Sequence, residues 1–219
     1  MTVPVIEFDH VSFAYEGQGA VLDGVDFKID SGEVVALKGP NGSGKSTSLR
    51  LMIGLDYAQA GTVRAFGSEI TKESMRDRAF AKRLHQRMGL VFQDPECMLF
   101  NPTVAQEIAF GPTQMGLSTE EVNTRVNDCL EIFALTHLKH RSPWRLSGGE
   151  KRRCALACVA SMAPEVLLLD EPTNDLDDKS RDLLIGFLSA FHQAGKTIVV
   201  STHESELIDD LSARTISFL

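Results

Sequence analysis

One short glycine-rich segment constrains this chain more than any other feature. The segment is Gly39-Pro40-Asn41-Gly42-Ser43-Gly44-Lys45-Ser46. It follows the apolar run Val34 to Leu37, which is typical of a strand buried on both faces, and it precedes a stretch with helical periodicity. Glycines let such a turn bring backbone N–H groups together, and the start of a helix adds partial positive charge. The segment therefore predicts a phosphate-binding turn at the end of a strand in an α/β sheet.

The pattern is that of a P-loop, in the strand-to-helix context that a P-loop requires. We expect the Lys45 ammonium group to reach the β- and γ-phosphates of a nucleotide. The Ser46 hydroxyl is expected to contact Mg²⁺, and Thr47 to donate to the α-phosphate. No Asn-Lys-x-Asp string, which guanine specificity usually needs, occurs in the chain.

A second apolar run, Val166 to Leu169, ends in two carboxylates, Asp170 and Glu171. Because open parallel sheets bind ligands at the carboxyl ends of their strands, we expect both side chains to face the phosphates. Asp170 is predicted to contact Mg²⁺ through water, and Glu171 to act as the general base.

The remaining patterns predict one α/β domain with an insertion. Alternating apolar residues in Ile6 to Tyr15 and in Val25 to Ile29 indicate an antiparallel sheet, and Thr197 to Val200 is a third buried run. The middle of the chain is mostly helical in pattern, with predicted helices over 119–134 and 148–162. Thr119 is the expected cap of the first, and 90–92 is the last buried-strand signal before them. We divide the chain into a core, 1–94 and 161–219, and an inserted helical subdomain, 95–160.

Composition argues against several classes of protein. Thirty Asp and Glu oppose 22 Lys and Arg, for a net charge of −8, which argues against nucleic acid as a partner. No segment resembles a secretion signal, and no apolar run approaches the roughly 20 residues of a membrane helix. The four cysteines lack zinc-site spacing, which indicates a reducing compartment.

Five further residues have no role in a simple P-loop kinase or GTPase: Leu146-Ser147-Gly148-Gly149-Glu150. With them, the chain resembles the ATP-binding-cassette (ABC) ATPases over nearly its whole length. Four other features of that family match in order and approximate spacing. They are the aromatic that stacks on adenine at Tyr15, the Q-loop glutamine at Gln93, the D-loop at Asn174-Asp175-Leu176-Asp177, and the switch histidine at His203.

The resemblance implies a RecA-like P-loop core with an N-terminal antiparallel β-subdomain and an inserted helical subdomain. It implies that ATP and Mg²⁺ are bound, with Gln93 as a further magnesium ligand and with Lys45, Gln93, Glu171 and His203 in catalysis. Two cassettes are expected to pack head to tail. Ser147, Gly148, Gly149 and Glu150 then bind the γ-phosphate of a nucleotide held by the P-loop of the second protomer. Because the chain stops at Leu219 without a C-terminal extension, we expect a homodimer.

Within the family, the segments 90–100, 102–104 and 108–112 are similar to those of energy-coupling factor importers, as is Glu150. This implies a peripheral subunit on the cytoplasmic face of the inner membrane. An integral membrane subunit would contact residues 93–112, and a substrate-binding membrane subunit would contact the chain only indirectly. Cobalt or nickel is the first expected cargo and biotin the second, although Cys97 and Met98 depart from the importer pattern.

Two alternatives remain open. One is a soluble ABC ATPase that acts on DNA, ribosomes or iron-sulfur assembly. The other is an exporter-type head, which shares the ATP-binding residues and differs mainly around 93–112.

Overall fold

The computed structural model describes residues 3–174 and 176–218. The strands are β1 (Ile6–Ala14), β2 (Ala20–Ile29), β3 (Val34–Lys38), β4 (Ala60–Ala65), β5 (Ser68–Glu69), β6 (Met88–Val91), β7 (Val166–Asp170), β8 (Thr197–Thr202) and β9 (Arg214–Ser217). The helices are α1 (Lys45–Met52), α2 (Lys72–Arg76), α3 (Arg78–Arg87), α4 (Val104–Met115), α5 (Thr119–Ile132), α6 (Gly148–Ala160), α7 (Asp178–Gln193) and α8 (Ser205–Asp210). Short 3₁₀ turns lie at Pro95–Met98, Thr136–Leu138 and Pro143–Arg145.

A parallel sheet forms the centre of the molecule, with strand order β6-β7-β8-β3-β9. The three apolar runs predicted as buried strands lie in β3, β7 and β8. Successive side chains of a strand point to opposite faces. Accordingly Val35 and Leu37 join one hydrophobic cluster, and Val34 and Ala36 join the other. Both faces of the sheet are covered, which explains why these strands are apolar at nearly every position.

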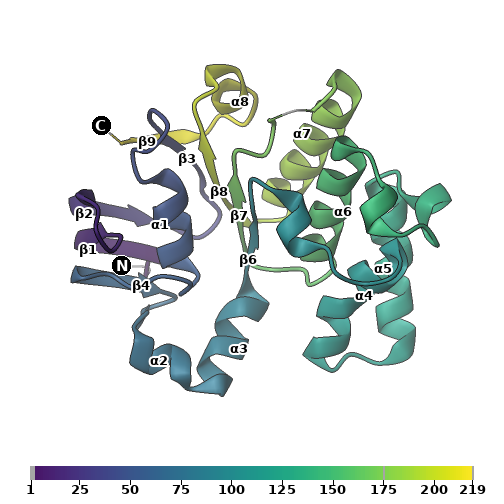
Figure 1. The fold of residues 1–219 in the computed structure, drawn as a ribbon, viewed down its shortest axis with the longest axis horizontal. Helices are drawn as coiled ribbons and strands as arrows, with labels where there is room; N and C mark the ends of the chain where they lie inside the picture. The colour runs from purple at the N-terminus through teal and green to yellow at the C-terminus, as the bar shows by residue number, and fades with distance from the viewer. Residues whose placement is uncertain (1–2, 175, 219) are drawn as a thin grey trace.

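Different elements cover the two faces (Figure 1). On one face, Phe8 of β1, Leu49 of α1 and Leu84 of α3 pack in the same cluster. The other face is covered by helices, and Leu156 of α6 and Leu184 of α7 are among the residues buried there. Helix α1, which starts at the P-loop, and helix α6, which starts after Ser147, therefore lie on opposite faces of the central sheet.

The second sheet is antiparallel, with order β2-β1-β4-β5, and the sequence predicted only its first two strands. β4 carries few buried apolar side chains, Val63 and Ala65, so its pattern is weak. Its close contact with β1 depends on Gly61, which has φ +74°. A Cβ atom there would lie 2.2 Å from the carbonyl oxygen of His10. A strand that depends on such a close approach leaves little signal in hydrophobic periodicity.

Two predicted helices of the insertion are present with corrected ends. Ser118, not Thr119, caps α5, and its side chain and that of Glu121 form a capping box. The helix ends at Ile132, shortly before Ala134, whose φ is +52°. Likewise α6 ends at Ala160, before Ala163 at φ +52°. A left-handed residue ends each helical run earlier than periodicity indicates.

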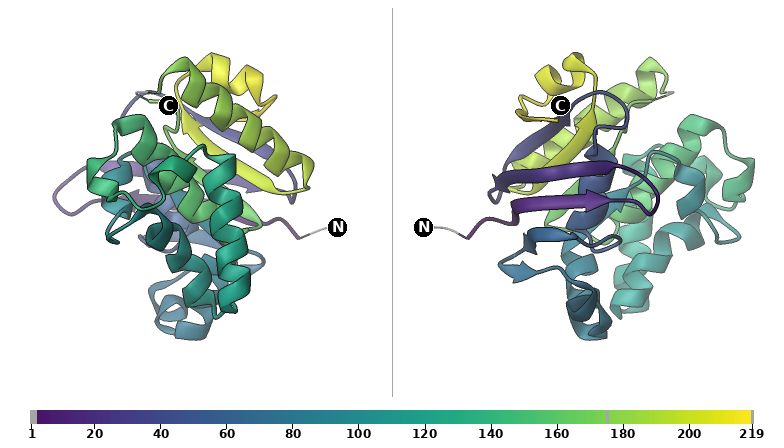
Figure 2. Two further views of the ribbon diagram at one scale, coloured as in Figure 1. Left: turned by 90° about the vertical axis from the view of Figure 1, so that its right-hand side faces the viewer. Right: turned by 60° about the vertical axis from the view of Figure 1, so that its left-hand side comes forward.

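The helical segment from about residue 100 to 160 faces the viewer in the left view of Figure 2 and lies on the right in the right view, so it forms one side of the molecule. The division into core and inserted subdomain stays a prediction. Among the helices of the described residues, none has the length and apolarity needed to cross a lipid bilayer.

Candidate active site

The P-loop presents free backbone donors at the start of α1. Gly44 caps this helix at φ +95° and offers no side-chain acceptor, whereas Ser147 caps α6 with its hydroxyl. A Cβ atom on Gly44 would lie 2.5 Å from the Leu22 side chain and 3.0 Å from the Val21 carbonyl oxygen, and the positive φ would strain any residue with a side chain. The Ser43 hydroxyl is buried without a hydrogen-bond partner. An uncapped helix start beside an unpaired buried hydroxyl is suited to bind an anion.

Lys45 brings a buried positive charge to this loop. Its ammonium group donates to the carbonyl oxygens of Gly39 at 2.8 Å and Pro40 at 3.0 Å. It lies 3.6 Å from Glu171 Oε1, and its side chain is only 5% exposed. Burial strengthens the attraction between this charge and a phosphate, because little water screens it.

Oxygen atoms suited to bind Mg²⁺ as ligands lie around the exits of neighbouring strands. Ser46 Oγ donates to Asp170 Oδ1 at 2.9 Å, and Ser201 Oγ donates to the same oxygen. Asp170 ends β7 and is buried. A carboxylate and a hydroxyl in contact are hard oxygen ligands of the kind that Mg²⁺ takes together with water and phosphate oxygens. The residues present therefore fit the metal that the P-loop implies.

Glu171 and His203 face each other across the exits of β7 and β8. His203 Nδ1 lies 3.2 Å from Glu171 Oε2, and the other carboxylate oxygen, Oε1, is buried without a hydrogen-bond partner. Glu171 has φ +43°, an uncommon left-handed conformation for a residue with a side chain. A buried acceptor beside the P-loop lysine is positioned to take a proton from a water molecule.

Tyr15 lies against the start of the P-loop helix. Its hydroxyl is 3.2 Å from Thr47 Oγ1, and its ring meets that of Phe13 edge to face with centroids 4.9 Å apart. The structure thus brings the predicted adenine-stacking residue next to the predicted phosphate site.

The Q-loop and D-loop residues meet the signature helix in a crevice. Gln93 lies two residues beyond Val91, which pairs with Leu169, so Gln93 is level with Glu171 on the neighbouring strand. A crevice of about 420 Å³ is lined by Gln93, Gly148, Asn174 and Leu176, among others. Asp177 caps α7 by accepting the Ser180 N–H at 2.8 Å. Asp175 lies outside the described residues.

The signature residues form the start of α6. Ser147 N–H donates to Glu150 Oε2 at 2.7 Å, and Ser147 Oγ accepts the Glu150 N–H at 3.4 Å, which completes a capping box. The bond from the Ser147 N–H lowers the pKa of the Glu150 carboxyl below its ordinary value. A Cβ atom on Gly148 would meet nothing within 4 Å, so the backbone there is open to a ligand.

The structure does not join the signature residues to the P-loop of the same chain. Among residues 3–174 and 176–218, no hydrogen bond or ion pair links 146–150 with 39–47. The two segments begin helices on opposite faces of the central sheet. The signature residues and the P-loop are therefore two separate groups of residues in this chain.

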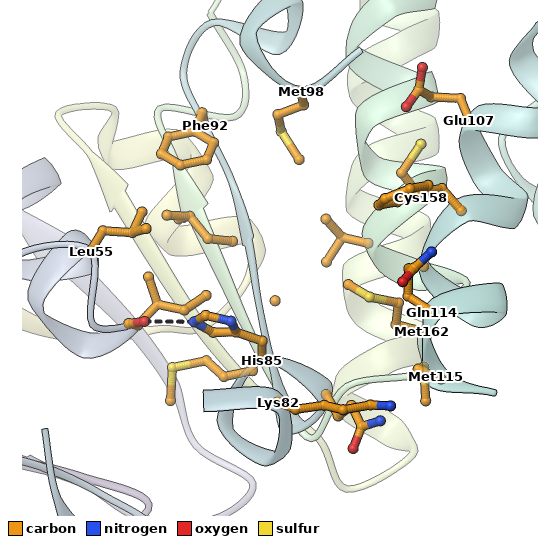
Figure 3. Close-up of a pocket in the computed structure, with 18 of the residues that line it drawn as sticks. Leu55, Lys82, His85, Phe92, Met98, Glu107, Gln114, Met115, Cys158 and Met162 are labelled. Atoms are coloured by element: carbon orange, nitrogen blue, oxygen red, sulfur yellow. Dashed lines mark hydrogen bonds between the residues drawn. The ribbon is translucent and has the colours of Figure 1, made fainter. Parts of the chain in front are cut away.

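An apolar groove of about 510 Å³ lies beside the Q-loop (Figure 3). In Figure 3, Leu55 and Phe92 line one wall, and Cys158 and Met162 line the facing helical wall. The large side chains at its rim are exposed: Leu55 by 44%, Phe100 by 59% and Phe110 by 43%. An exposed apolar groove of this kind marks an interaction surface.

Glu107 holds the loop above this groove. Its buried carboxylate accepts the N–H groups of Phe100 at 2.8 Å and Asn101 at 2.6 Å. Phe100 in turn meets Phe110 edge to face, with centroids 4.9 Å apart. The loop between β6 and α4 therefore forms a fixed part of the groove's rim.

Sequence reasoning missed two residues that bond to the site. The sequence assigned no role to Ser201, because this residue follows a run of apolar strand residues. In the structure its hydroxyl donates to Asp170 and accepts from the Glu171 N–H. Arg152 was hidden in the charged string after the signature glycines, yet its side chain is buried. A polar residue at the exit of a buried strand was the available signal for Ser201.

Comparison with known proteins identifies the family. The ABC transporter family model matches residues 22–174. A nickel import ATP-binding protein, NikO of Rhodobacter capsulatus, is 45% identical over 208 residues, which is 94% of this chain and 82% of NikO. Another, LarO of Lactiplantibacillus plantarum, is 42% identical over 214 residues, 98% of this chain and 88% of LarO.

Solved structures agree with these sequences. CbiO1 of Clostridium perfringens, described as part of the ABC transporter complex CbiONQ, matches with a TM-score of 0.80 and 32% identity, covering 94% of this chain and 80% of that one. The ATP-binding cassette MJ0796, solved as a dimer bound to ADP and phosphate, matches with a TM-score of 0.86 and 28% identity. It covers 97% of this chain and 94% of the cassette. The chain belongs to the ABC transporter family and is an ATPase that uses ATP and Mg²⁺.

Proposed function

We propose that this ATPase energises an importer of the energy-coupling factor type, with nickel or cobalt as the cargo. The observation that carries the proposal is the match of nearly the whole chain to two nickel import ATP-binding proteins. The likeness to a subunit of the CbiONQ complex supports the same class of transporter.

Each half of the site has a proposed role in hydrolysis. Lys45 and the P-loop amides bind the phosphates, and Ser46, Asp170 and Gln93 hold Mg²⁺, which neutralises phosphate charge when bound. Glu171 takes a proton from the attacking water molecule. His203 orients that water molecule and contacts the γ-phosphate. The 3.2 Å contact between His203 Nδ1 and Glu171 Oε2 supports this pairing.

The second half of the site is proposed to come from an identical protomer. Because α1 and α6 lie on opposite faces of the sheet, Ser147 to Glu150 are available to a nucleotide bound elsewhere. In a head-to-tail pair, each P-loop faces the partner's signature residues and Asn174 to Asp177 lie between the two sites. ATP then stabilises the closed pair by the difference between its affinities for the closed and open states.

The apolar groove is the proposed binding site for a short amphipathic helix from an integral membrane subunit. It adjoins the predicted contact region 93–112, and its methionines, Met98, Met115 and Met162, adapt readily to an apolar partner. Lys82 and Gln114 at its edges offer polar contacts to the hydrophilic side of such a helix. This contact would place the chain at the cytoplasmic face of the membrane, with the substrate-binding subunit touching it only indirectly. The segment 95–160 would move as the inserted subdomain.

The test is co-purification with native membrane proteins, followed by ⁶³Ni and ⁵⁷Co uptake into vesicles. We expect uptake with the unmodified chain and none with Lys45→Ala. Phe110→Asp, which places a charge at the rim of the groove, should lose the membrane subunit but keep ATP binding. Ile132→Asp is the matched control, because Ile132 is 52% exposed on α5 and does not line the groove.

The outcomes separate the proposal from its alternatives. Membrane partners without metal uptake would reassign the cargo to biotin or another vitamin. Recovery of no membrane subunit from mild detergent would overturn the transport assignment in favour of a soluble ABC ATPase.

A further inference from the structure

A buried arginine on α6 joins two loops of the site through their backbone carbonyl groups. Arg152 lies on α6 and is 5% exposed. Its Nη2 donates to the carbonyl oxygen of Gln93 at 2.8 Å, and its Nη1 donates to the carbonyl oxygen of Glu171 at 3.3 Å. A guanidinium group is planar and presents its donors in fixed directions, so one side chain sets the spacing of both carbonyls.

The backbone of Glu171 depends on such contacts. Its φ of +43° is unfavourable for a residue with a side chain and persists only where neighbours hold it. The Glu171 N–H donates to Ser201 O and Oγ, each at 3.1 Å. On the other side, the Glu171 carbonyl accepts from Arg152 and from the Asn174 N–H at 3.4 Å. The residue is held at both ends.

This conformation directs the carboxylate. Oε2 lies 3.2 Å from His203 Nδ1, and Oε1 lies 3.6 Å from Lys45 Nζ. Rotation of the Glu171 backbone toward an ordinary conformation would swing both oxygens away from these partners. A displacement of about 1 Å at a reacting group costs on the order of 10²-fold in rate.

We propose that Arg152 is a positioning residue for ATP hydrolysis: it holds the Glu171 backbone so that the carboxylate faces the reacting centre, and it fixes Gln93 to the same helix. A second link supports the connection, because Lys151 Nζ pairs with Glu96 Oε1 at 2.5 Å, three residues beyond Gln93. The helix that begins with the signature glycines is thereby connected to the proposed base of its own chain. The inference deepens the proposed role of Glu171 and rests on it.

The first test separates kcat from KM in steady-state hydrolysis. Arg152→Gln should lower kcat by about 10- to 100-fold and leave the KM for ATP within about threefold, since the phosphate contacts are untouched. Arg152→Lys should recover part of the loss, because an ammonium group still donates to one of the carbonyls. The matched control is Arg125→Gln, which removes another guanidinium bond to a carbonyl, that from α5 to Ser161 at the C-terminal end of α6 at 2.9 Å.

The second test is a double-mutant cycle in single-turnover hydrolysis. If Arg152 acts through Glu171, Arg152→Gln should cause little further loss in a Glu171→Gln background. Equal losses in both backgrounds, or a raised KM with unchanged kcat, would overturn the inference. Wild-type turnover by Glu171→Gln alone would instead remove the proposed base. If Arg152→Gln lowers the melting temperature far more than Arg125→Gln does, Arg152→Lys is tested in its place. Its kcat should still lie below that of the wild type, and a wild-type kcat would count against the inference.

Discussion

The P-loop half and the signature half of the site are built in different ways. Around the P-loop, side chains from α1 and from the exits of β7 and β8 already contact one another, as in the bonds from Ser46 and Ser201 to Asp170. At the signature, Ser147 and Glu150 bond to each other, and Gly148 is open. The first half is assembled within the chain, and the second is presented outward. The difference supports the proposal that one chain binds the nucleotide and that a second protomer is needed for its hydrolysis.

Loss of the proposed base should have the largest effect. Glu171→Gln should lower turnover by about 10²- to 10⁴-fold, the usual contribution of general-base catalysis, while the P-loop still binds ATP. Turnover and ATP affinity are to be measured on one preparation, together with its mass by equilibrium sedimentation in Mg-ATP. We expect a trapped dimer. A variant that hydrolyses ATP freely would end the assignment of Glu171, and a strict monomer would count against the pair.

Removal of the aromatic ring beside the P-loop should affect binding more than turnover. Base stacking contributes about 1–3 kcal/mol, so Tyr15→Ala should raise the KM for ATP by about 5- to 150-fold with a smaller change in kcat. Tyr15→Phe, which keeps the ring and loses the contact with Thr47, should raise KM much less. A loss confined to kcat in the alanine variant would give Tyr15 a different role.

The smallest effect concerns the capping box of the signature half. The folded pKa of Glu150 lies below its ordinary value of 4.5, so its charge stabilises the fold above that pH, and the stabilisation disappears as pH falls through the lowered pKa. Glu150→Gln keeps a hydrogen-bonding side chain but removes the charge near the helix start, at a cost of about 0.3–1 kcal/mol near neutral pH. Thermal unfolding of both proteins across pH 3 to 8 measures this, and a difference that grows toward acid would contradict it.

Local patterns predicted most of the P-loop half. The apolar runs ending in Asp170 and before His203 predicted that both residues lie at strand exits, because parallel strands end on the same edge. That the two strands are neighbours was learned from the structure. Ser201 and Arg152 escaped, since their roles depend on which strand or helix packs behind the loop, and periodicity does not report that. β4 was missed for a related reason: it depends on the close approach of Gly61 to β1.

The signature half was predicted as a motif, but its position was not. The sequence alone does not place α6 and α1 on opposite faces of the sheet; the packing of Leu156 and Leu49 in separate clusters does. That separation supports the proposal that a second protomer completes the site.

Complementation between two inactive variants tests whether a second protomer completes the site. Lys45→Ala disables the P-loop half and Ser147→Arg the signature half, so each homodimer lacks any complete site. In an equal mixture, each mixed dimer has one intact P-loop facing one intact signature, and random pairing should restore about a quarter of the wild-type ATPase rate. Each variant alone should be nearly inactive. A mixture no more active than the sum of its parts would contradict the account.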